Sequence, residues 1–181
     1  MKRAITVFIL AATLLSGCAG SREAREFAAF QRALADTERI EFTAQITGVA
    51  TGAEYAVRVT RAGEELRAEL TAPETVAGVT FHSDETGRTL EFDGLILELT
   101  PGLPGALSPC EAAGILLGAL TQGSLDSAGR AGEYTALTLM APGEETVTLW
   151  RAKSGEPVYA EIGRGGTAEL IMHIDNWHIE E

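Results

Sequence analysis

The sequence predicts an α+β domain that is mostly β, and three features predict it. A helical pattern opens the domain, segments of alternating apolar and polar residues follow it, and a second, apolar helical segment interrupts them. The 181 residues fit one domain, and an apolar content of 45% is enough for a core. The formal net charge of −12 argues against a nucleic-acid-binding protein, which needs a basic face.

The N-terminus has the pattern of an export signal. Two basic residues precede Ala4–Leu15, an apolar run of 12 residues, whereas a membrane-spanning helix needs about 20. The next residues, Leu-Ser-Gly-Cys at 15–18, resemble the lipobox of bacterial lipoproteins, in which small residues admit the peptidase and the thiol accepts the lipid. We expect residues 1–17 to be a lipoprotein signal peptide. The alternative is an ordinary signal peptide with an incidental cysteine.

Cys18 is therefore the expected lipid-attachment site. Cleavage before it leaves 164 residues with a formal net charge of −14. Two or three acyl chains, such as palmitate, would anchor this mature chain stably. We expect an exported protein on the extracytoplasmic side of a cell membrane, with residues 18–22 as a lipidated tether and residues 23–181 as the domain.

The domain opens with one helix and a meander of strands. Glu23–Arg39 has its aromatic and aliphatic residues at helical spacing and contains no Gly or Pro, which predicts an amphipathic helix. The period then changes to two in Ile40–Thr47, Tyr55–Thr60 and Leu66–Leu70, with turn residues between these segments. This pattern predicts three antiparallel strands joined by short loops.

Shorter strands follow a break in the pattern. Residues 71–79 contain Pro and Gly and are expected to form a loop, after which strand character restarts at Phe81. Asp-Gly at 93–94 predicts a tight turn between strands at 90–92 and 95–99.

A second helix is expected to begin at Ser108. Ser108 provides a capping hydroxyl, Pro109 occupies the first helical position and Glu111 follows three residues after the cap, which together resemble a capping box. The body of the helix to Leu120 is apolar on nearly all sides, so it is expected to be buried or to cover an apolar surface. The apolar loop Pro101–Leu107 precedes it.

The remaining chain returns to strand patterns and contains no internal repeat. Four segments alternate in polarity or are rich in β-formers, and turn-like sequences with Pro, Gly or Ser connect them. The expected strands are 134–140, 146–151, 158–162 and 167–179.

No catalytic residue, metal site or cofactor is predicted. Cys110 at a helix start could be a reactive thiol, but a small buried packing residue is favoured, and a crosslink between two copies stays open. His173 and Asp175 share one strand face, whereas His178 is expected on the opposite face, so the three do not form a metal site unless the strand bends.

The order of elements and the lipobox are similar to those of the LolA/LolB-like lipoprotein-carrier family. The resemblance covers Glu23–Glu181 and includes the stretch Ala72–Thr80, the turn at Phe92–Leu95 and the inserted helix. It implies an unclosed antiparallel β-barrel, or half-barrel, with an N-terminal helix and an inserted helix that covers the concave face. It also implies a hydrophobic cavity for acyl chains, with these candidate lining residues: Phe42, Ile46, Tyr55, Val57, Leu66, Leu70, Phe92, Ile115 and Leu116.

Two functions are consistent with this resemblance. The first is a membrane-anchored, non-enzymatic lipoprotein that binds a lipid or another hydrophobic ligand in the half-barrel. The alternative is an envelope interaction module that binds or activates an envelope enzyme, such as a cell-wall amidase in spore germination. The first predicts an empty interior, and the second predicts a filled interior with a stable protein partner. Fold alone does not choose between them, and a homodimer is possible.

Overall fold

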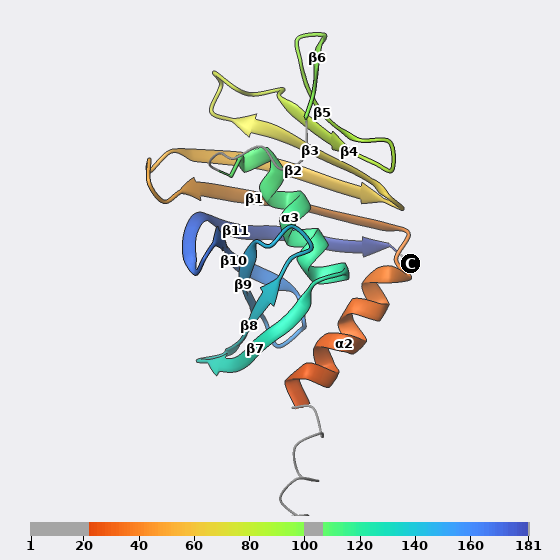
Figure 1. Ribbon diagram of the computed structural model, residues 1–181, viewed down its shortest axis with the longest axis vertical. Coiled ribbons are helices and arrows are strands. Elements are labelled where there is room, and N and C mark those ends of the chain that lie inside the picture. The colour runs from red at the N-terminus through yellow and green to blue at the C-terminus, as the bar shows by residue number, and fades with distance from the viewer. Residues whose placement is uncertain (1–21, 100–106, 181) are drawn as a thin grey trace, which may run out of the picture.

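The computed structural model describes residues 22–99 and 107–180, which form two helices and one antiparallel sheet of eleven strands (Figure 1). The elements in chain order are α2 (Arg22–Ala35), β1 (Arg39–Gly48), β2 (Glu54–Ala62), β3 (Glu65–Ala72), β4 (Thr80–Ser83), β5 (Arg88–Phe92), β6 (Leu95–Glu98), α3 (Pro109–Thr121), β7 (Ser124–Ala131), β8 (Tyr134–Met140), β9 (Thr146–Arg151), β10 (Pro157–Arg164) and β11 (Thr167–Glu180).

The sheet is a half-barrel that curves around α3. Its strand order is β6-β5-β4-β3-β2-β1-β11-β10-β9-β8-β7, so β6 and β7 are the two edges and do not pair with each other. Helix α3 contacts β2, β3 and β4 in one half of the sheet and β8, β9 and β10 in the other half, while α2 contacts α3 and β7 (Figure 1). The predicted fold class, a mostly β half-barrel with an inserted helix on its concave face, is confirmed.

The core lies between the sheet and α3, and strand alternation builds it. In β1, Ile40, Phe42, Ala44 and Ile46 are buried, and the residues that alternate with them are more exposed. The same alternation buries Leu170 and Met172 of β11, which pairs with β1. Burial of one large apolar side chain contributes about 1.5–3 kcal/mol to stability, so this continuous apolar layer holds the curved sheet on its helix.

Helix α3 begins where the sequence predicts. Ser108 adopts an extended backbone conformation, and its hydroxyl oxygen accepts a hydrogen bond from the Cys110 backbone N–H at 3.3 Å. Gly114 lets the helix approach the sheet closely, since a Cβ at this position would lie only 3.1 Å from Leu66 Cδ2 of β3. The cap and this close approach fix α3 against the sheet.

The first helix is shorter than predicted. It ends at Ala35, and Arg39 is already the first residue of β1. The Thr37 hydroxyl donates to the Ala33 carbonyl at 2.8 Å just beyond the helix end, and Arg39 pairs with residues of both β2 and β11. Tertiary strand pairing therefore overrides the helical pattern at 36–39.

Strand β7 is absent from the sequence prediction. Its residues, Ser-Leu-Asp-Ser-Ala-Gly-Arg-Ala, are poor β-formers without alternation, and most of them are exposed. Pairing with β8 creates the strand, with a register shift between Leu125 and Ser127. An edge strand of this kind has little sequence signal because only one neighbour specifies it.

Candidate functional site

Most of the predicted cavity residues lie in the packed core. Six of the nine are buried, namely Phe42, Ile46, Val57, Leu66, Leu70 and Leu116. Tyr55 and Ile115 are half-buried against this core, whereas Phe92 is 46% exposed on β5. The structure thus brings eight of the nine residues to one apolar cluster and places Phe92 outside it. That they line a ligand cavity stays a prediction.

Helix α3 occupies the middle of the concave face. Its buried residues cover more than one side of the helix, as predicted for an apolar helix. They are Cys110, Ala112, Ala113, Leu116, Leu117, Ala119 and Leu120. These side chains pack on the strands of both halves of the sheet, so an acyl chain in the middle of the half-barrel would compete with α3 for the same space.

A hollow of about 330 Å³ lies at one end of the concave face, where α2 meets the ends of β9 and β11. Phe30, Trp177 and Ile179 supply apolar walls, and Trp177 stacks on Phe42 with ring centroids 5.2 Å apart. This volume is at the small end of the range for ligand sites, about 300–1,000 Å³. The hollow could accept a small apolar group or one end of a longer molecule.

One cation faces this hollow. The Arg151 guanidinium lies 3.9 Å from the centroid of the Phe30 ring and donates from Nε to the Gly155 carbonyl at 2.7 Å. Burial lowers the pKa of Arg151, yet an arginine remains charged at any physiological pH. An apolar wall beside a cation suits a ligand with an apolar body and an anionic end.

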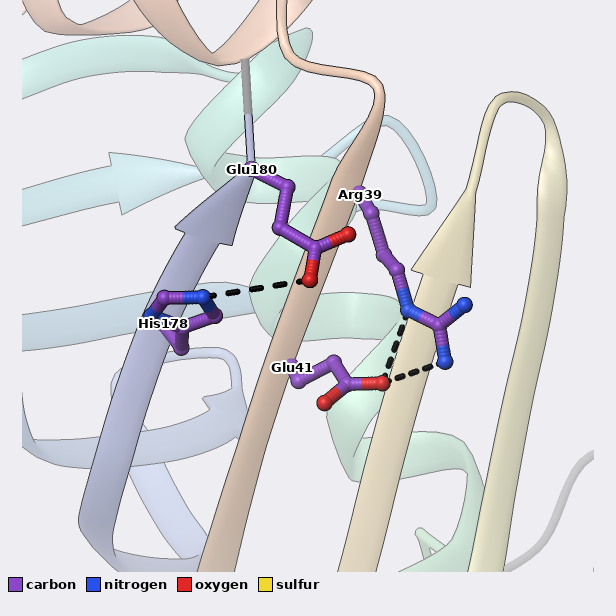
Figure 2. Close-up of polar contacts among 4 residues, drawn as sticks. All are labelled: Arg39, Glu41, His178 and Glu180. Atoms are coloured by element: carbon purple, nitrogen blue, oxygen red, sulfur yellow. Dashed lines mark hydrogen bonds and ion pairs between the residues drawn. The ribbon is translucent and has the colours of Figure 1, made fainter.

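The outer face of the sheet carries paired surface charges. Figure 2 shows Arg39 and Glu41 of β1 beside His178 and Glu180 of β11. Arg39 Nε donates to Glu41 Oε1 at 2.7 Å, and this hydrogen bond raises the Arg39 pKa, while His178 Nε2 lies 3.9 Å from Glu180 Oε1. Solvent screens exposed pairs of this kind, so they contribute little to stability. These pairs belong to the solvated surface of the sheet.

The predicted orientation of His178 is wrong. Asn176 has a positive φ of 53°, and the β1–β11 register shifts between Glu41 and Thr43, so β11 contains a bulge. Beyond it Trp177 faces the core, and His178 is exposed on the same face as His173 and Asp175. Within residues 22–99 and 107–180, no three His, Cys, Asp or Glu side chains are grouped so that they could hold a metal ion.

Cys110 is a buried packing residue, as the sequence favoured. Its side chain is 2% exposed, and it forms no disulfide in the described part of the chain. Burial raises the pKa of the Cys110 thiol to about 11, which outweighs the hydrogen bond with Ser108. The reactive-thiol alternative is therefore not supported.

The hairpin of β5 and β6 exposes a cluster of large apolar side chains that sequence reasoning missed. Leu95, Ile96 and Leu97 are 75%, 69% and 62% exposed, and Phe92 adjoins them. The available signal was three consecutive apolar residues after a tight turn, where a half-buried strand would alternate. The expected apolar loop Pro101–Leu107 falls outside the described residues except for Leu107, which is buried.

No protein-family model and no curated protein sequence matches the chain, but solved structures do. An uncharacterized conserved protein from Thermus thermophilus has a TM-score of 0.53 at 14% identity, over 88% of this chain and 89% of that one. A LolA superfamily protein from Nitrosomonas europaea has a TM-score of 0.44 at 9% identity, over 87% and 94%. A chain in the complex of the Clostridioides difficile CwlD amidase with the GerS lipoprotein has a TM-score of 0.46 at 13% identity, over 84% of this chain and 92% of that one. Likeness at such identities concerns the fold alone. The chain shares its fold with the Thermus thermophilus protein, and it has the unclosed antiparallel half-barrel and covering helix that the resemblance implied.

Proposed function

We propose that this chain is a non-enzymatic lipoprotein of the bacterial envelope that acts by binding another protein. The observation that carries the proposal is the burial of α3 in the concave face, where Leu116 and Leu120 are both fully buried. A half-barrel filled by its own helix is suited to presenting a surface rather than to enclosing a ligand. The high pKa of Cys110 and the surface positions of the histidines support a non-enzymatic role.

The proposed location rests on Cys18. This residue and the signal peptide lie outside the described residues, and neither helix in the described ranges is long and apolar enough to cross a membrane. Cells that make the chain would be fed a palmitate analogue with a clickable tag. We expect the label on the wild type and on Cys110→Ala, and no label on Cys18→Ala. Label that persists in Cys18→Ala would contradict the anchor.

A second candidate function is binding of a small hydrophobic or amphipathic ligand. The hollow lined by Phe30, Trp177 and Ile179 favours it, because it combines apolar walls with the cation of Arg151. A fatty acid could place its carboxylate near Arg151 and the start of its chain against Trp177. The volume of about 330 Å³ suits part of such a molecule, and the packing of α3 opposes deeper entry.

Titration of the full chain in mild detergent with a dansylated fatty acid separates the two functions. Protein binding as the only function predicts no saturable uptake, and native mass spectrometry should show no lipid beyond the covalently attached one. Binding of one dansylated fatty acid per chain, with displacement of this probe by palmitate, would favour the second candidate. Trp177→Ala should then abolish uptake, whereas Trp150→Ala, which removes a tryptophan in edge-to-face contact with Tyr159, should not.

A further inference from the structure

The β5–β6 hairpin is apolar on both of its faces. Side chains alternate along a strand, so Leu95 and Leu97 lie on one face of β6 and Ile96 lies on the other. All three are more than 60% exposed, the highest values among the large apolar residues of the described chain. A monomer rarely leaves such a cluster uncovered, and an exposed apolar edge strand is a template for pairing.

Backbone groups that pair with no second strand among the described residues accompany these side chains. The Leu99 N–H donates to the Arg88 carbonyl at 2.8 Å, which makes 88–99 a hydrogen-bonded pair of the hairpin. By alternation, Leu97 and Leu95 bond to β5, so the N–H and C=O groups of Ile96 and Glu98 point to the outer edge of the sheet. The hairpin can therefore offer backbone hydrogen bonds as well as apolar contacts.

The other edge of the sheet is protected. Strand β7 carries Asp126 and Arg130, its pairing with β8 is shifted after Leu125, and α2 packs beside it. Charges, an irregular register and a covering helix all discourage an added strand. Between the two sheet edges that the described residues form, β6 is the one chemically suited to accept an added strand.

The position of the hairpin argues against a membrane as its occupant. Figure 1 shows β6 at one end of the long axis of the molecule and the start of α2 towards the other end, and α2 begins at Arg22. Cys18 precedes Arg22 by four residues, which span at most about 14 Å. A chain anchored through Cys18 would thus direct its hairpin away from its own membrane.

The charge around the hairpin argues against a second copy of the chain. Glu91, Asp93 and Glu98 outnumber Arg88, so the hairpin has a formal charge of −2. Self-pairing would bring two such hairpins together on chains that already carry excess negative charge, and like charges disfavour this contact. A partner with basic side chains beside an apolar strand complements the hairpin.

We infer that β6 is a docking strand to which a partner protein of the envelope adds a β-strand of its own. The added strand bonds to the backbone of Ile96 and Glu98 and covers the leucines with apolar side chains, and lysine or arginine residues beside it face Glu98 and Asp93. This inference rests on the proposed protein-binding function and names the surface that performs it.

Photo-crosslinking from the hairpin tests the inference. The full chain, with p-benzoylphenylalanine in place of Leu97, is illuminated in the cells that make it, and the adducts are mapped by mass spectrometry. We expect one protein adduct, with the crosslink on a strand that has basic neighbours. A crosslink to a second copy, to lipid, or to a surface without these properties would overturn the inference.

Two substitutions and one control variant decide whether a strand is added. Ile96→Pro removes an outward N–H and leaves the hairpin bonds of Leu95 and Leu97 intact, and proline is tolerated on an edge strand. One lost hydrogen bond corresponds to about a tenfold loss of adduct. The control Ile96→Val keeps the N–H and should keep the adduct. Equal melting temperatures of the variants would show that each one folds. Glu98→Lys should lower the yield several-fold. Insensitivity of the adduct to Ile96→Pro would overturn strand addition.

A second probe position separates this inference from the proposed function. The same photo-reactive residue at Asp126 of β7 should give no adduct with the partner. If Asp126 yields a protein adduct and Leu97 does not, the docking strand is wrong and protein binding stands. If neither position yields an adduct and the fatty acid is taken up one-to-one, the proposed function itself fails.

Discussion

Replacement of Leu116 by alanine tests whether α3 is a packed part of the core. Leu116 is 0% exposed in the middle of α3. The substitution removes three carbon atoms, with a transfer free energy of about 2 kcal/mol. The space left behind adds a further 1–2 kcal/mol, so we expect a loss of about 3–4 kcal/mol in the free energy of unfolding. For a domain of this size, that loss lowers the melting temperature by about 6–16 °C.

Urea denaturation of the full chain in detergent, followed by circular dichroism, measures this loss. Leu97→Ala is the matched control: this leucine is 62% exposed, and we expect a loss below about 1 kcal/mol. If Leu116→Ala cost no more than Leu97→Ala, α3 would be a loosely held cover over an unfilled face. That result would refute the reasoning that α3 fills the middle of the half-barrel, on which the proposed function rests.

Three further substitutions or measurements follow from the structure. Ser108→Ala removes the cap of α3 and should cost about 1 kcal/mol of unfolding free energy in the same urea assay. Gly163→Ala would drive a Cβ into the Thr167 backbone oxygen at a bulge, so a loss of about 2 kcal/mol or more is expected, and an unchanged midpoint would contradict the local geometry. Iodoacetamide should label Cys110 slowly at pH 8 in the native chain and rapidly in urea. The pKa of the Cys110 thiol is about 11 in the folded chain, above its ordinary value of 9.0. The neutral thiol therefore contributes fully to the free energy of unfolding below pH 9, and this contribution is lost as the pH rises towards 11.

Local chemistry made several elements predictable. Ser108 and Pro109 mark the start of α3 because capping depends on adjacent residues alone. The Asp93-Gly94 pair marks the hairpin turn, and both residues indeed have positive φ angles, 50° and 77°. The alternation in β1 likewise reports the buried face directly.

What depends on distant partners was not predictable. Strand β7 forms because β8 lies beside it. The bulge at Asn176 arises where β11 pairs with β1, and it places His178 on the sheet face opposite to the predicted one. The hollow beside Arg151 unites residues from α2, β9 and β11, which no local pattern connects. The apolar triplet at Leu95–Leu97 was visible in the sequence, but its exposure follows from the edge position of β6.

Hydrogen exchange of α3 tests the central claim most directly. Amide exchange in Pro109–Thr121 would be compared with that in β1 for the full chain, with and without excess palmitate. If the helix is a permanent part of the core, its amides exchange as slowly as those of β1, and palmitate leaves them unchanged. Fast exchange of α3 without ligand, or exchange that accelerates when palmitate is added, would show that the helix yields its place to an acyl chain and would contradict the account.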